Sequence, residues 1–120
     1  MRSLIPAIAI AATALAALAA GTALAHHGWG SYDSEKKFTI ESPIESVVWQ
    51  NPHVHVMLKY QNATWEVTLA PVSRMTLRGV VEDMLKPGVV ISAEGYPSTR
   101  NEHEMRAERI TIAGKVYEMR

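Results

Sequence analysis

Two histidines stand two residues apart in the stretch HVHVMLKY, residues 53–60. If this stretch is a β-strand, His53 and His55 lie on the same face, roughly 6.5 to 7 Å apart at the backbone. Two imidazoles at that separation can converge on one metal ion. Met57 extends the same row with a thioether, a ligand that also tolerates Cu(I). The pattern indicates a candidate transition-metal site.

The other three histidines are His26 and His27, which follow an apolar N-terminal segment, and His103, which lies in a polar loop. If the chain is cleaved after Ala25, the amine and ring of His26 can chelate Cu(II), and His27 can bind copper through amine, amide and imidazole. Such nitrogen donors suit Cu(II), Ni(II) and Zn(II), and the Irving–Williams order favours copper. We therefore predict a periplasmic copper or zinc binder. Its expected ligands are His26, His27, His53, His55, Met57 and His103.

A solvated outer surface explains the same histidines without a metal. Polar side chains alternate along the wet face of any half-buried antiparallel strand. Lys59 continues the row of His53 and His55, and its positive charge opposes a cation. On this interpretation Met57 packs at a rim and His103 is an ordinary loop residue. Both explanations remain open from the sequence.

The first 25 residues have the pattern of a secretory signal peptide. Arg2 precedes an Ala/Leu/Ile-rich run that ends in Ala23-Leu24-Ala25, an A-x-A cleavage pattern. Because no stop-transfer pattern follows, cleavage is favoured over a stable membrane anchor. We expect an exported protein, periplasmic or secreted, that begins at His26.

Composition narrows the classes of function. Removing 25 of the 120 residues leaves 95, enough for one domain. Twelve basic and twelve acidic residues balance, so there is no basic track for nucleic acid. The absence of cysteine excludes disulfides, thiol nucleophiles and zinc-thiolate sites. No nucleophile motif or fixed pair of carboxylates is apparent, so the sequence disfavours an enzyme without excluding one.

The order of the expected elements is three strands, a short helix and two strands, which is typical of a five-stranded Greek-key barrel of the OB type. An open sandwich is the alternative. Residues 26–37 are polar and contain glycine, and they are expected to form an extended arm before the barrel domain of residues 38–120. The expected strands are 38–49, 53–60, 63–69, 89–96 and 105–113, with a helix over 71–78, a second helical turn over 81–86 and a short terminal strand after Gly114-Lys115. Pro43 should mark a bulge or an unpaired edge position.

Aromatic residues support a second hypothesis, in which the barrel binds a partner without metal. OB-type barrels bind ligands on strands two and three and on the flanking loops. Trp29 and Tyr32 on the arm, and Trp49 after the first strand, are the candidate partner-binding residues, whereas Trp65 is expected in the core. An envelope glycan, peptide or protein fits the neutral charge, and a monomer or weak oligomer is expected.

Several motifs together resemble a known family. They are His26-His27-Gly28-Trp29 with Tyr32-Asp33, Trp49-Gln50-Asn51-Pro52-His53-Val54-His55, Leu85-Lys86-Pro87-Gly88 and Gly95-Tyr96-Pro97. In these motifs the chain is similar to the small secreted bacterial proteins grouped as the domain-of-unknown-function family numbered 6152. Its turn at Gln61-Asn62-Ala63 and its helix start at Pro71-Val72-Ser73 are shorter than is usual there. The resemblance implies an exported OB-like domain and assigns no activity.

Overall fold

The computed structural model describes residues 28–120, so the predicted signal peptide, His26 and His27 lie outside the described residues. Contacts divide the chain into a unit that ends at Ser31 and a compact unit, Tyr32–Arg120. In the first unit, Trp29–Ser31 form one turn of 3-10 helix, η3, where the sequence predicted an extended arm. No helix among the described residues is long and apolar enough to cross a membrane.

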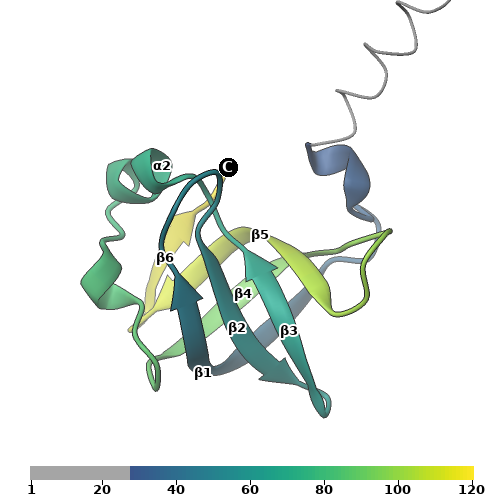
Figure 1. The fold of residues 1–120 in the computed structure, drawn as a ribbon, viewed down its shortest axis with the longest axis horizontal. Helices are drawn as coiled ribbons and strands as arrows, with labels where there is room; N and C mark the ends of the chain where they lie inside the picture. The colour runs from purple at the N-terminus through teal and green to yellow at the C-terminus, as the bar shows by residue number, and fades with distance from the viewer. Residues whose placement is uncertain (1–27) are drawn as a thin grey trace, which may run out of the picture. The chain divides into compact units, whose positions relative to one another are not determined.

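The second unit is a closed five-stranded barrel with one additional strand (Figure 1). The strands are β1 Phe38–Val48, β2 His55–Tyr60, β3 Ala63–Thr68, β4 Val90–Pro97, β5 Glu104–Ile112 and β6 Lys115–Glu118. Their order is β3-β2-β1-β4-β5-β6, and a parallel pairing of β3 with β5 closes the barrel. This is the predicted OB-type topology, with β6 added at the outer edge of β5. The alternative of an open sandwich is wrong.

The long first strand changes partners along its length, which lets one strand serve two sides of the barrel. Residues 38–43 of β1 pair with β4, and residues 44–48 pair with β2. The register shifts between Ile44 and Ser46, just after Pro43, whose ring nitrogen cannot donate to a ladder. The bulge predicted at this proline therefore lies one or two residues further along the strand.

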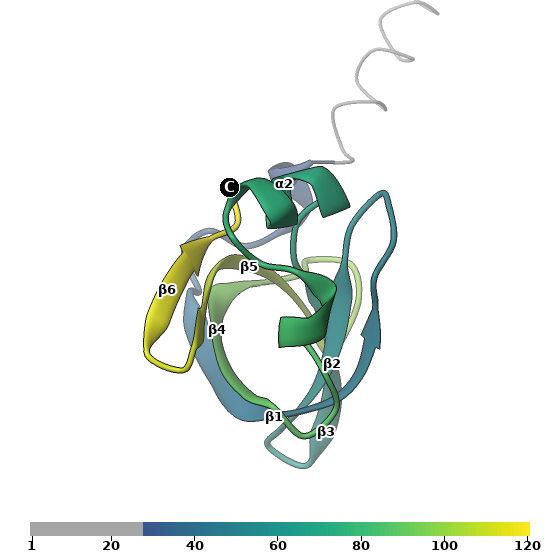
Figure 2. The ribbon, with the colours of Figure 1, turned by 90° about the vertical axis from the view of Figure 1, so that its left-hand side faces the viewer.

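Alternating apolar residues fill the barrel, as the period-two pattern of the strands predicts. Val54, Val56 and Leu58 are fully buried, while the intervening His55 and Met57 are only half-buried. Figure 2 shows the strands curving around the space that these core side chains occupy. Because the inward positions are apolar, the side chains available for chemistry lie on the outer face.

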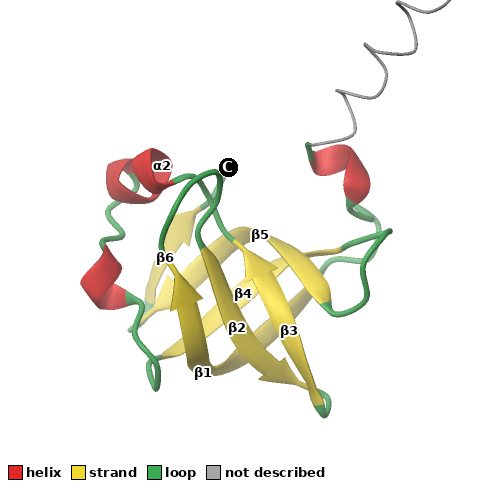
Figure 3. Ribbon diagram, in the orientation of Figure 1, coloured by secondary structure: helices red, strands yellow, loops and turns green. Residues whose placement is uncertain are grey.

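The connection between β3 and β4 contains the short helices of this unit, α2 Val72–Leu77 and the 3-10 turn η4 Glu82–Met84 (Figure 3). It adds the buried side chains of Met75, Val80 and Leu85 to the core, and in Figure 2 it lies across the end of the barrel that faces the viewer. The Asn51 amide oxygen accepts a hydrogen bond from Val72 N at 3.0 Å, so the loop after β1 caps α2. This contact holds the loop that leads into His53 against the helix.

Candidate binding face

Polar side chains gather on the outer face of three strands, β2, β3 and β5. In the register, His55 lies opposite Thr68, Thr68 opposite Arg106, and Glu66 opposite Glu104. Tyr32 adjoins these strands through the contacts described below, and His53 lies two residues before His55, where β2 begins. We call this surface the polar face and define it by seven residues: Tyr32, His53, His55, Glu66, Thr68, Glu104 and Arg106.

His55 is held by two neighbours on β3. Its Nδ1 lies 3.1 Å from Glu66 Oε1 and 3.3 Å from Thr68 Oγ1. A carboxylate on one ring nitrogen fixes the orientation of an imidazole and leaves the other nitrogen for a ligand. His55 Nε2 is therefore the ring atom that can contact a ligand, and 28% of the side chain is exposed.

His53 lies just before β2 and is half-buried. Burial lowers the pKa of His53 below its usual value of 6.5, and the charges of Arg106, His55 and Arg74 lower this pKa further. The imidazole is consequently neutral near pH 7, which is the form that binds metals and donates a neutral hydrogen bond. The same two arginines that keep His53 neutral also oppose a metal cation beside it.

Arg106 is a cation with only 8% of its surface exposed. Its guanidinium carbon lies 5.9 Å from the centroid of the Tyr32 ring, a distance at which a cation is attracted to an aromatic face. Burial lowers the pKa of Arg106, and although Tyr32 opposes this shift, the charges of Arg120 and Arg74 add to it. A buried arginine close to two others requires compensation from its surroundings.

Tyr32 connects the residues before β1 to this face. Its hydroxyl donates a hydrogen bond to Glu104 Oε2, and burial together with that bond raises the pKa of Tyr32 to about 12. Backbone contacts hold it there, because Tyr32 forms a β-bridge with Ser98 and Asp33 N donates to Pro97 O at 2.9 Å. The predicted partner-binding residue Tyr32 therefore lies on the polar face.

The loop between β4 and β5 also helps to position Glu104 on the polar face. Ser98 Oγ accepts hydrogen bonds from the backbone N–H groups of Arg100 and Asn101, both at 3.1 Å. Asn101 Nδ2 donates to Glu104 Oε1 at 2.7 Å, so Glu104 is held from both of its oxygens. The Glu104 carboxylate is thus positioned by loop and tyrosine together.

The ring of His103 contacts Trp65 rather than a residue of the polar face. Its imidazole packs edge-on against Trp65, with centroids 5.4 Å apart, and its carbonyl accepts a hydrogen bond from Glu66 N at 2.8 Å. Within residues 28–120 no group of three or more His, Cys, Asp or Glu side chains is arranged to hold a metal ion. Met57 is half-buried on β2, in the row predicted for it. Metal binding by the predicted ligand set, which includes His26 and His27, stays a prediction.

The three tryptophans lie in different surroundings. Trp49 is partly buried and packs against the core, and Trp29 is half-buried within η3. Trp65 also packs against the core, where it forms edge contacts with Phe38 and Tyr60 at centroid distances of 5.2 and 5.9 Å. The roles of Trp29 and Trp49 in partner binding stay predictions.

Sequence reasoning missed four residues at this site: Glu66, Thr68, Glu104 and Arg106. Alternation in β3 indicated that Glu66 and Thr68 face outward, but nothing local marked them as neighbours of His55 and Arg106. The parallel pairing of β3 with β5 creates that proximity, and it joins segments almost forty positions apart. The site therefore depends on closure of the barrel, which the pattern of residues along the sequence does not reveal.

Comparisons with known proteins agree with this fold. The ZRD-deleted mutant of TiaS, crystallised with agmatine, matches with a TM-score of 0.52 and 15% identity over 72% of this chain, and the match spans only 27% of the TiaS chain. At that identity the likeness concerns the fold alone. A search of curated proteins found no match. The model of a family of unknown function, DUF6152, matches residues 14–108, and the chain therefore belongs to that family.

Proposed function

We propose that the chain is an exported small binding domain whose contact surface is the polar face. The observation that carries this proposal is the set of contacts on this face: His55 Nδ1 lies 3.1 Å from Glu66 Oε1, the Tyr32 hydroxyl donates to Glu104 Oε2, and the Arg106 guanidinium carbon lies 5.9 Å from the Tyr32 ring centroid. Among the described residues, five groups have a clearly shifted pKa, and Tyr32, His53 and Arg106 lie together on the polar face. The other two, Arg109 and Glu118, form an ion pair with each other. Shifted pKa values that cluster on one surface favour a functional site.

The geometry favours a partner bound without metal, as an envelope glycan, peptide or protein would be. The β2 and β3 surface is where OB-type barrels bind extended ligands, and Tyr32 offers an aromatic ring beside hydrogen-bonding groups. Export rests on the pattern of residues 1–25, which fits a secretory signal peptide. The domain would then meet its ligand outside the cytoplasm.

The test is a chemical-shift map of the protein with soluble peptidoglycan fragments released by muramidase, which supply both glycan and peptide. Shifts confined to the polar face support the proposal. Glu66→Ala, which frees His55, should weaken the fragments' effect, whereas Glu41→Ala on the exposed side of β1 is the matched control. Shifts that map instead to the surface of Glu94, Arg109 and Glu118 would overturn this assignment of the face.

A copper or zinc site is the second candidate, and one contact favours it. Glu66 holds Nδ1 of His55, the arrangement in which a carboxylate orients a metal-binding histidine. His53 and His55 would be joined by His26 and His27 of the processed N-terminus. Titration of the naturally processed protein with Cu(II) and Zn(II), followed by calorimetry and electron paramagnetic resonance, tests it. One tight equivalent that is lost in the His53→Ala, His55→Ala double variant would establish this site.

A further inference from the structure

We propose that the end of the barrel beside the β2–β3 turn binds a proline-rich extended peptide, at a site separate from the polar face. Four rings meet there: Phe38 of β1, Tyr60 of β2, Trp65 of β3 and His103 of the loop before β5. We call these four residues the aromatic end. Figure 1 shows the β2–β3 turn on the side of the barrel away from α2. The inference goes beyond the proposed function because none of the four belongs to the polar face.

Trp65 is at the centre of the aromatic end. Its ring centroid lies 5.2 Å from that of Phe38, 5.9 Å from that of Tyr60 and 5.4 Å from that of His103, each pair edge to face. Phe38 and Tyr60 also contact each other, with centroids 5.6 Å apart. Mutual contacts of this kind are favourable and hold the rings in defined relative orientations. The aromatic end therefore presents a preformed apolar surface to a ligand.

The rings of the aromatic end remain in contact with solvent. The three apolar rings are only partly buried and His103 is exposed, whereas Ile40 and Leu58, two positions further into the barrel along β1 and β2, have no exposed surface. His103 has a φ of 57°, a left-handed conformation that costs energy in a residue other than glycine. That conformation accompanies the contact of its ring with Trp65. The ring surface that remains open is available for a ligand to pack on.

A hollow of about 420 Å³ opens beside the aromatic end at the β2–β3 turn. Gln61 and Asn62 form this two-residue turn, with φ values of 50° and 65° that are typical of a type I′ hairpin. The residues that line the hollow are Lys59, Tyr60, Gln61, Asn62, Ala63 and Thr64. Because Tyr60 belongs both to the hollow and to the ring cluster, one ligand can contact the rings and the turn together.

The hydrogen-bonding groups of the hollow favour a ligand that is rich in acceptors. The Lys59 ammonium only donates, and the Gln61 and Asn62 amides each offer an NH₂ group. Among the described residues that line the hollow, none is a carboxylate. A sugar presents hydroxyl donors, for which a carboxylate is the stronger acceptor. The hollow therefore fits carbonyl oxygens better than it fits a glycan.

A proline-rich peptide combines free carbonyl oxygens with apolar rings. Its polyproline II helix has no internal hydrogen bonds, and proline has no N–H group that would need an acceptor. Such helices dock on aromatic-lined surfaces, where their preformed backbone loses little conformational entropy on binding. Proline rings can pack on Tyr60 and its neighbours while the carbonyls accept hydrogen bonds from the amides of the turn.

The experiment titrates the protein with an oligoproline peptide blocked at both ends, and separately with a blocked Gly-Ser peptide of the same length. Amide spectra follow the Trp65 indole N–H and the side-chain NH₂ groups of Gln61 and Asn62. We expect saturable shifts of these signals with oligoproline and none with the Gly-Ser peptide, which lacks both the rings and the preformed helix. Maltotriose, a neutral glycan, should leave the same signals unchanged.

Two variants separate the rings from the turn. Tyr60→Leu should weaken oligoproline binding about tenfold, which corresponds to about 1.4 kcal/mol. Trp49→Leu is its matched control, because Trp49 is also partly buried against the core but follows the far end of β1. Asn62→Gly removes only an amide, since glycine suits the φ of 65°, and should weaken binding about threefold. Asn62→Gly decides the matter if Tyr60→Leu does not fold.

Three results would overturn the inference. They are equal behaviour of the two peptides, equal weakening by Tyr60→Leu and Trp49→Leu, and shifts of the Trp65 indole with maltotriose but not with oligoproline, which would make the aromatic end a glycan site. None of them bears on the polar face, because the peptidoglycan fragments and Glu66→Ala report on that surface. Failure of the fragments would in turn leave the oligoproline result intact.

Discussion

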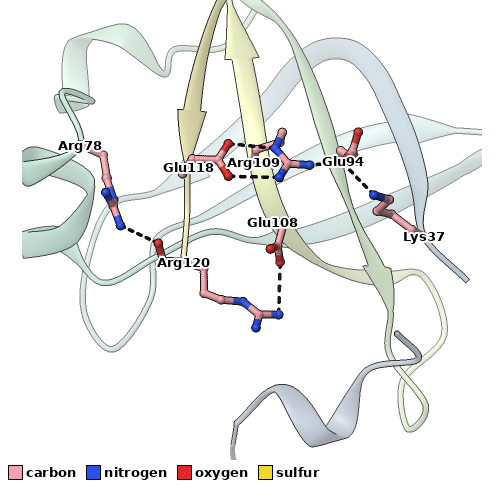
Figure 4. A network of polar contacts seen from close by, with 7 residues as sticks. All are labelled: Lys37, Arg78, Glu94, Glu108, Arg109, Glu118 and Arg120. Carbon is pink, nitrogen blue, oxygen red and sulfur yellow. Dashed lines mark hydrogen bonds and ion pairs between the residues drawn. The ribbon is translucent and has the colours of Figure 1, made fainter. Parts of the chain in front are cut away.

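Arg106 and Arg109 stand three residues apart on β5 and experience opposite environments. Arg109 is about one-third exposed and is flanked by Glu94 and Glu118, whose hydrogen bonds and charges raise its pKa (Figure 4). Arg106 is almost fully buried against the Tyr32 ring, and burial lowers its pKa. The first arginine belongs to an ion network that joins β4, β5 and β6. The second is a buried charge that the fold maintains at a cost, which is typical of functional sites.

The largest expected effect concerns the backbone beneath Arg106. A Cβ on Gly95 would meet the Arg106 carbonyl oxygen and come within 2.8 Å of Ala107 Cα, so β4 and β5 would have to separate. Gly95→Ala should lower the free energy of unfolding by about 3 kcal/mol. Urea denaturation measures it, with Gly30→Ala as the control because its added Cβ meets nothing within 4 Å. Equal stability of the two variants would show that β4 and β5 tolerate separation here.

The next effect comes from the tyrosine that covers Arg106. Tyr32→Phe removes the hydroxyl that donates to Glu104 and should lower the free energy of unfolding by about 1 kcal/mol. Because the pKa of Tyr32 is about 12, against a usual 10, the folded state favours the neutral phenol. Stability contributed by Tyr32 should be present below pH 10 and be lost as the pH rises toward 12.

An ultraviolet titration checks the raised pKa of Tyr32. The wild-type spectrum should contain one tyrosinate transition near pH 12 that is absent from Tyr32→Phe. If the variant loses a transition near pH 10 instead, Tyr32 does not contact Glu104 in solution.

The smallest effect is a dependence of stability on acid pH. The pKa of His53 lies below 6.5 because of burial and of the charges on Arg106, His55 and Arg74, so the unfolded chain binds a proton first. The contribution of His53 should be complete above pH 6.5 and should decrease as the pH falls through this value toward the folded pKa. His53→Gln should therefore show a smaller loss of stability between pH 7 and pH 5 than the wild type. Identical pH profiles would mean that His53 titrates normally.

The sequence predicted the barrel because period-two alternation and turn residues are local signals. Each strand boundary lies within two residues of its expected position; β2, for example, begins at His55 rather than His53. The outward placement of His55 and Met57 followed from the same alternation. The loop that includes His103 was also expected, since its polar run follows β4 directly.

The composition of the site could not be predicted in the same way. Arg106 stands in the run Met105-Arg106-Ala107, where alternation marks it as an outward charge and gives no sign of its burial. Its burial depends on Tyr32, which lies 74 positions earlier, and on pairing of β5 with β3. These contacts form only when distant segments pair to close the barrel, and the residue types at single positions do not reveal that pairing.

One measurement tests the contrast between the two arginines most directly: the free energies of unfolding of Arg106→Met and Arg109→Met, compared with wild type in phosphate-free buffer at low salt. Replacing a buried cation with an apolar side chain of similar length should raise the free energy of unfolding by about 1 kcal/mol. Arg109→Met should lower it, because Glu94 and Glu118 lose their partner. Opposite signs are the predicted result. If Arg106→Met destabilises the protein as Arg109→Met does, Arg106 is a structural residue and the polar face loses its strongest claim to a ligand.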